Sequence, residues 1–95
     1  MSAFEYRSQK LFCEGMALES LAARFGTPTY IYSQAAILAN FDTLRRGLER
    51  ISPLICYSVK ANSNLKILKL LAQAGGGFDI VSGGELARAR AAGAA

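Results

Sequence analysis

Histidine and tryptophan are absent from this chain of 95 residues, which also contains only two cysteines and two prolines. Zinc sites are built mainly from cysteine and histidine, and Cys13 and Cys56 lie far apart with no CxxC pair, so we expect no metal site. No apolar run approaches the roughly 18 residues of a membrane span, and the first residues lack the pattern of a leader peptide. We therefore expect a cytoplasmic protein with no membrane partner.

The basic residues do not gather in one segment. Lysine and arginine number 11 against 7 aspartates and glutamates, which gives a net charge of +4. They are spread along the chain, and no basic run is interleaved with aromatic residues in the manner of a nucleic-acid-binding segment. We therefore expect no nucleic-acid partner and assign these side chains to solvated helix faces.

The apolar content is sufficient for a packed core, with 52% hydrophobic and 19% charged residues. The first half of the chain predicts four elements: a hairpin over 4–13, a helix over 17–25, a strand over 29–32, and an amphipathic helix with an apolar stripe from 37 to 51. Gly26 and Pro28 end the first helix. Ser33 caps the second, because its hydroxyl can accept a bond from a free backbone N–H.

The second half predicts two strand–helix pairs: strands over 54–59 and 78–81, and helices over 65–72 and from the Ser82–Glu85 capping box to 92. This order is typical of parallel β/α units, and the nearly continuous apolar run 54–59 indicates a strand buried on both faces. Gly75–Gly77 follows a helix instead of a strand. We therefore interpret it as a helix terminator and not as a dinucleotide-binding loop.

Parallel β/α folds collect reactive groups at the carboxyl ends of strands, and Lys60 lies at such an end. A lysine such as Lys60, if held against apolar walls, loses solvation of its ammonium form and becomes available as a nucleophile. Asp79, in the middle of the second strand, is a natural partner for a positive charge on Lys60. From position alone, Lys60 and Asp79 could equally be solvated, and Glu85 could simply cap its helix together with Ser82.

Two segments carry a resemblance to a known family: Tyr57–Asn64, with the sequence YSVKANSN, and Gly77–Leu86, with the sequence GFDIVSGGEL. Together they resemble the paired signatures of the ornithine, diaminopimelate and arginine decarboxylases, pyridoxal-phosphate (PLP) enzymes of the alanine-racemase-like fold. Gly26–Ser33 also resembles the N-terminal segment of this family. Ser58 stands where relatives usually carry alanine. The likeness is greatest to the diaminopimelate decarboxylases and covers nearly the whole chain.

The resemblance implies that Lys60 is catalytic and holds PLP as a covalent aldimine, and that Asp79 and Glu85 also contribute to cofactor binding. It implies a carboxy-lyase that converts a small amino-acid substrate, meso-2,6-diaminopimelate, to L-lysine and CO₂, and that acts as a homodimer. The alternatives are another decarboxylase of the family, of the ornithine, arginine or carboxynorspermidine type, or a non-catalytic regulatory paralogue. Retention of all three charged residues argues against the paralogue.

The resemblance also implies an α/β fold, with residues 34–95 forming the first part of a PLP-binding (β/α)₈ TIM barrel. Residues 1–33 then contribute to a second, β-rich domain. Because such a barrel takes about 250 residues, we expect these 95 residues to be an N-terminal fragment that is inactive alone. The phosphate-binding loop, the partner of the pyridine nitrogen and the substrate-binding residues would follow Ala95.

Overall fold

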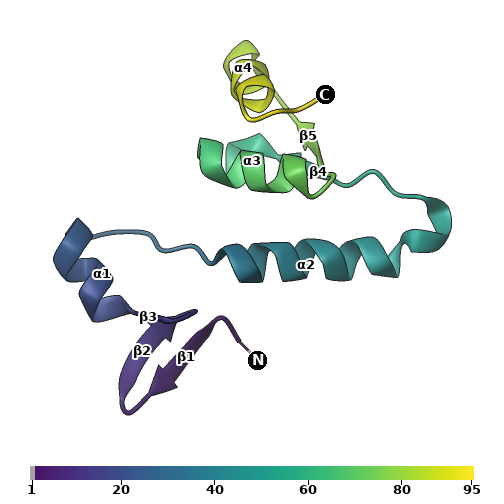
Figure 1. The fold of residues 1–95 in the computed structure, drawn as a ribbon. Helices are drawn as coiled ribbons and strands as arrows, with labels where there is room; N and C mark the ends of the chain where they lie inside the picture. Colours follow the sequence, from purple (N-terminus) through teal and green to yellow (C-terminus); the bar gives the residue numbers. More distant parts are fainter. Residues whose placement is uncertain (1) are drawn as a thin grey trace. The chain divides into compact units, whose positions relative to one another are not determined.

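The computed structural model describes residues 2–95, which form a mixed α/β chain (Figure 1). It divides into two compact units, residues up to Asn40 and Phe41–Ala95, with the boundary inside helix α2 (Gln34–Gly47). No helix among the described residues is long and apolar enough to cross a membrane.

The first unit begins with the predicted hairpin, formed by β1 (Phe4–Arg7) and β2 (Lys10–Cys13). The strands pair antiparallel, from Phe4 opposite Cys13 to Arg7 opposite Lys10. The two residues between them have positive φ, 50° at Ser8 and 68° at Gln9, as a tight two-residue turn requires. A short third strand, β3 (Met16–Ala17), pairs antiparallel with β2 and was not predicted.

Helix α1 (Leu18–Phe25) confirms the next predicted element and ends at Gly26, where φ is 86°. The strand predicted over residues 29–32 is wrong, because this segment has no regular structure. Its β-branched and aromatic residues fit a pleated surface only where a neighbouring strand supplies one, and none of the described strands pairs with it. Tyr30 and Tyr32 instead stack on each other and remain exposed.

Helix α2 starts after Ser33, whose hydroxyl accepts a hydrogen bond from Ala36 N at 3.0 Å, as predicted. The helix stops at Gly47, before the end of the apolar stripe, and a 3₁₀ turn, η1 (Glu49–Ile51), follows. The low helix propensity of glycine explains the early stop. Near the end of α2, a hydrogen bond from Arg45 lowers the pKa of Asp42, and the charge of Arg46 adds to the effect.

The second unit contains the predicted β/α order: β4 (Cys56–Ser58), the 3₁₀ turn η2 (Val59–Ala61), α3 (Leu65–Gln73), β5 (Gly77–Asp79) and α4 (Gly83–Ala91). The two strands are parallel, with Cys56 opposite Gly77 and Ser58 opposite Asp79. Both are shorter than predicted. Val59 and Leu68 are completely buried and form the core with Ala92, against which Tyr57, Phe78 and Ile80 pack.

The three consecutive glycines end α3 and lead into β5, as predicted. Gly75 has a φ of 95°, which favours glycine, and Gly76 N donates to Leu71 O at 2.9 Å. Gly77 lies against β4, where a Cβ added to it would be 3.0 Å from Cys56 Sγ. The glycine run is therefore a turn that brings the two strands close together.

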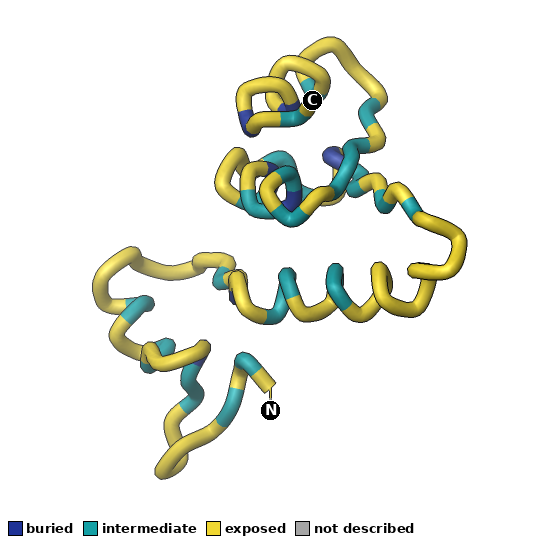
Figure 2. Tube along the Cα trace, turned by 45° about the vertical axis from the view of Figure 1, so that its right-hand side comes forward, coloured by how far each residue is buried: buried dark blue, intermediate teal, exposed yellow. Residues whose placement is uncertain are grey.

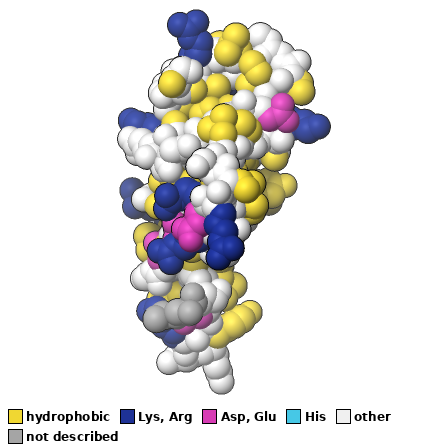
Figure 3. Space-filling model, turned by 90° about the vertical axis from the view of Figure 1, so that its right-hand side faces the viewer, with side chains coloured by type: hydrophobic (Ala, Val, Ile, Leu, Met, Phe, Trp, Pro, Cys, Tyr) yellow, Lys and Arg dark blue, Asp and Glu magenta, His cyan; other side chains and the backbone are white. Residues whose placement is uncertain are grey.

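The predicted burial of the first strand on both faces is wrong for the described residues. Leu54 is 73% exposed and Cys56 is exposed, because the sheet of this unit has only two strands. A hollow of about 730 Å³ lies beside β5, lined largely by small and apolar residues that include Leu54, Phe78 and Leu86. Figure 2 shows that few positions of the trace are buried. In Figure 3, hydrophobic side chains are exposed in the upper part of the view, where α3 and α4 lie.

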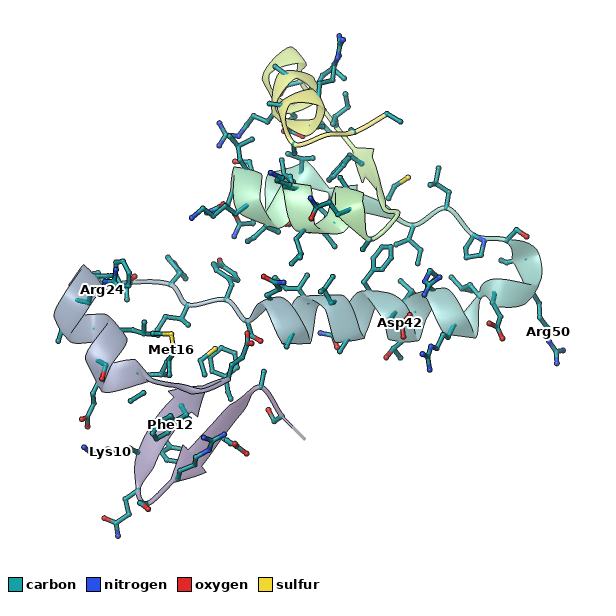
Figure 4. All side chains as sticks on the ribbon, in the orientation of Figure 1. Lys10, Phe12, Met16, Arg24, Asp42 and Arg50 are labelled. Carbon is teal, nitrogen blue, oxygen red and sulfur yellow. The ribbon has the colours of Figure 1, made fainter. Side chains whose placement is uncertain are left out.

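The basic side chains come from many elements, as their distribution in the sequence indicates. Figure 4 labels Lys10, Arg24 and Arg50, which lie on β2, α1 and η1 respectively. Lys10 pairs with Glu19 at 3.5 Å within the first unit. This distribution of basic side chains does not test whether nucleic acid is a partner. The expected absence of such a partner stays a prediction.

Candidate functional site

Lys60 lies in η2, the turn that directly follows β4. The residue before it, Val59, is completely buried in the core, whereas Lys60 itself is exposed. The backbone is thus anchored next to the lysine, whereas the lysine itself is exposed to solvent. The described residues do not provide the apolar walls that would deprive its ammonium form of solvation.

Asp79 is the last residue of β5 and is exposed, so its predicted place in the middle of the strand is wrong. It lies opposite Ser58 in the parallel register, and Ser58 Oγ donates a hydrogen bond to Asp79 Oδ2 at 3.4 Å. Lys60 follows Ser58 by two positions, so the lysine and the aspartate emerge from the same edge of the sheet. Among residues 2–95, no ion pair joins Lys60 to Asp79.

Glu85 takes part in the cap of α4, as its spacing from Ser82 predicts. Glu85 N donates to Ser82 Oγ at 3.1 Å, and Glu85 Oε1 accepts a bond from Val81 N at 3.1 Å. In the usual capping box, the glutamate accepts a hydrogen bond from the backbone N–H of the N-cap residue, which here would be Ser82. Glu85 accepts instead from Val81, one position earlier. The carboxylate is thereby fixed in the loop that follows β5.

The loop between Lys60 and α3 is held by side chains. Asn64 Oδ1 accepts from Lys66 N at 2.9 Å, which caps α3, and Asn62 Oδ1 accepts from Asn64 N at 3.0 Å. Asn64 thus caps α3, and Asn62 holds the loop before it. Two further bonds reach the loop from outside: Tyr57 Oη donates to Asn62 O at 3.0 Å, and Arg88 Nε donates to Ser63 O at 2.9 Å.

Sequence reasoning missed Tyr57 and Arg88. Tyr57 belongs to an apolar run, and Arg88 matches the polar pattern of a helix surface, so neither carries a periodic or motif signal of its own. Only the parallel packing of the two β/α units places Arg88 beside a loop 25 positions earlier in the chain.

The donor set fits a carbonyl-bearing cofactor better than a metal. A primary amine, Lys60, can bond covalently to an aldehyde, and Asp79 on the paired strand can balance a positive charge that results. No group of three or more metal-ligating side chains occurs among the described residues. Cys13, the buried thiol of the first unit, is a poor nucleophile, because burial and then the charge of Glu14 raise its pKa.

Comparison with curated proteins gives many similar sequences. A diaminopimelate decarboxylase of Pseudomonas fluorescens is 58% identical over 93 residues, which cover 98% of this chain and 22% of the relative. The enzyme of the same name from Haemophilus influenzae is 43% identical over the same share of each chain. The chain thus spans about a fifth of the length of the curated relatives that it matches.

Comparison with solved structures also finds similar proteins. A protein of Aquifex aeolicus superposes with a TM-score of 0.92 at 49% identity, over 97% of this chain and 23% of that one. A diaminopimelate decarboxylase of M. jannaschii, solved with L-lysine, superposes with a TM-score of 0.90 at 35% identity, again over 97% and 23%. Residues 34–95 match the family described as pyridoxal-dependent decarboxylase, pyridoxal binding domain. With its lysine and aspartate at the ends of two parallel strands, this chain belongs to the pyridoxal-dependent decarboxylase family.

Proposed function

We propose that the protein containing these residues catalyses the PLP-dependent decarboxylation of meso-2,6-diaminopimelate to L-lysine and CO₂. The observation that carries this proposal is the placement of Asp79 at the end of β5, opposite Ser58, with Lys60 two positions after Ser58. The choice of substrate is supported by the relatives named diaminopimelate decarboxylase, which are 43–58% identical to this chain.

Lys60 is the residue that holds the cofactor, through a covalent bond from Nζ. PLP supplies an electron sink for the electron pair that the departing CO₂ leaves behind. Asp79 contributes a negative charge at the edge from which Lys60 emerges, which favours a protonated nitrogen there. Ser58 orients this carboxylate through its hydroxyl.

Glu85 combines a structural role with a chemical one. Its Oε1 accepts from Val81 N and holds the loop after β5, and its charge supports the lysine and the cofactor. The exposure of Lys60 suits an attachment point that the cofactor must reach.

For the whole protein we propose two domains and a dimer. Residues 34–95 begin a (β/α)₈ barrel and residues 1–33 contribute to a β-rich domain, with PLP bound on the barrel. The protein is a cytoplasmic homodimer. Family resemblance supports the two domains and the dimer, and the exposed Leu54 and the hollow beside β5 are consistent with further strands that complete the sheet.

Borohydride reduction of the full-length protein with PLP, followed by peptide mapping, tests the site. We expect a pyridoxyl group on Lys60, which Lys60→Arg removes and the matched control Lys66→Arg retains. Label elsewhere in the wild-type protein would overturn the assignment.

Substrate choice needs a second assay, in which the wild-type protein receives meso-diaminopimelate, ornithine, arginine or carboxynorspermidine. We expect release of CO₂ with diaminopimelate, together with one equivalent of lysine. Faster turnover of another of these compounds would change the assigned substrate, and the proposed role of Lys60 would be unaffected. No turnover of any amine by a correctly labelled protein would favour the regulatory paralogue.

A further inference from the structure

The loop that follows Lys60 is attached to two different elements of the second unit. From β4, Tyr57 Oη donates to Asn62 O at 3.0 Å, and from α4, Arg88 Nε donates to Ser63 O at 2.9 Å. Two consecutive carbonyls are therefore held by side chains from elements that precede and follow the loop in the sequence. The bonds from Asn62 and Asn64, by contrast, are internal to the loop and the start of α3.

External support matters here because Lys60 has little support of its own. It lies in a 3₁₀ turn of three residues, a conformation with poorer hydrogen-bond geometry than an α-helix, and its side chain is exposed. On its N-terminal side the backbone is fixed by Val59, which is completely buried. On its C-terminal side, the external anchors are the Tyr57 and Arg88 bonds.

Of the two anchors, only Arg88 connects the loop after Lys60 with the helix that follows the Asp79 strand. It lies one turn after Glu85 on α4, the helix that follows the Asp79 strand, and its bond ends in the loop that follows Lys60. A guanidinium is planar and permanently charged, so a bond from it to a carbonyl is stronger and better oriented than a neutral one. The bond thus couples the position of the Lys60 loop to that of the helix bearing Glu85.

We propose that Arg88 is a positioning residue for Lys60: through Ser63 O it holds the 61–64 loop, and so keeps the lysine in register with Asp79 and Glu85. This rests on the proposed function, in which Lys60 carries the cofactor. Arg88 itself touches neither cofactor nor substrate in this role. Its substitution should change how readily Lys60 reacts, and the fold should be retained.

The test uses the full-length protein in four forms: wild type, Arg88→Met, Arg88→Lys and the control Arg90→Met, which removes an arginine from the same helix. Amide exchange of residues 61–64 is measured in the apoprotein, and pyridoxyl labelling of Lys60 is followed at PLP concentrations below saturation. We expect Arg88→Met to speed exchange about tenfold, the effect of one charge-assisted hydrogen bond, and to slow labelling severalfold. Arg88→Lys, which can still donate to Ser63 O, should recover part of both effects.

The outcomes separate this proposal from the proposed function. A wild-type protein that is not labelled at Lys60 would overturn the proposed function, and the positioning role with it. Normal labelling of Lys60 in Arg88→Met would overturn the positioning role alone, even if loop exchange increases, because Arg88 would then be merely structural. Equal effects of Arg90→Met and Arg88→Met would also overturn it.

Discussion

Ser58 and Asp79 occupy paired positions on the parallel strands β4 and β5, and Ser58 Oγ donates a hydrogen bond to Asp79 Oδ2 at 3.4 Å. The pairing fixes which side chains meet at the carboxyl edge of the sheet. A slip of one residue would turn Asp79 to the other face, away from the edge that Lys60 follows. The register of two short strands therefore determines the geometry of the candidate site.

The charge of Asp79 can be separated from its hydrogen bond. Asparagine at this position still accepts from Ser58 Oγ but carries no negative charge. In the full-length protein we expect Asp79→Asn to lower the rate of CO₂ release at least about a hundredfold, the usual scale for loss of an electrostatic contact at a reacting centre. Ser58→Ala leaves the carboxylate in place and should cost less than about tenfold. Equal losses in the two variants would contradict the proposed role of the charge.

The two roles of Glu85 can be distinguished by comparing glutamine with alanine. Glu85→Gln keeps an oxygen that can accept from Val81 N, so the cap of α4 should survive and the melting temperature should remain unchanged. We expect CO₂ release nevertheless to fall about tenfold or more, equivalent to roughly 1.4 kcal/mol of lost charge stabilisation. Glu85→Ala should lose both activity and thermal stability. Full activity in Glu85→Gln would reduce Glu85 to a helix cap.

The β/α order and the capping residues could be predicted because they depend on local pattern. Alternating apolar segments, the glycines after α3 and the Ser82–Glu85 spacing each act within a few positions. Two of the contacts that were missed span longer distances: Arg88 reaches back 25 positions to Ser63, and Glu14 reaches 19 positions to Ser33. Such contacts depend on how elements pack, which no local pattern specifies.

The strand predicted at 29–32 failed for a related reason. Its residue types favour β-structure, but β-propensity measures fit to a neighbouring strand and not an intrinsic backbone preference. The solvent exposure of Leu54 likewise follows from the size of the neighbouring sheet, which has only two strands among the described residues.

The contact between Glu14 and Ser33 leads to a stability prediction for the first unit. Ser33 is buried, accepts from Ala36 N at 3.0 Å and donates to Glu14 Oε2 at 3.0 Å. We expect Ser33→Ala to weaken the start of α2 by about 1 kcal/mol, the usual cost of removing a cap. Amide exchange at Ala36 in the full-length protein measures this as an increase of about fivefold.

The same measurement tests whether Glu14 acts through Ser33. In a double-mutant cycle with Glu14→Ala, the effect of Ser33→Ala should become smaller, because the hydroxyl has already lost its acceptor. Strictly additive effects would show that the two side chains stabilise α2 independently. Arg24→Ala, on a different helix of the same unit, is the control and should leave Ala36 exchange unchanged.

The close approach of Gly77 to β4 predicts a mutation and its rescue. A Cβ at position 77 would lie 3.0 Å from Cys56 Sγ and 3.4 Å from Leu54 Cδ1, so Gly77→Ala must push the sulfur aside or separate the strands. We expect a loss of about 1–3 kcal/mol in the free energy of unfolding, typical of overpacking. Because Cys56→Ala removes the sulfur, the double variant Cys56→Ala/Gly77→Ala should regain most of that loss. The control is Gly83→Ala, whose added Cβ meets nothing within 4 Å and should cost little. Urea unfolding of the full-length variants provides the measurement, and a double variant no more stable than Gly77→Ala would show that the backbone, and not Cys56, limits the approach of the two strands.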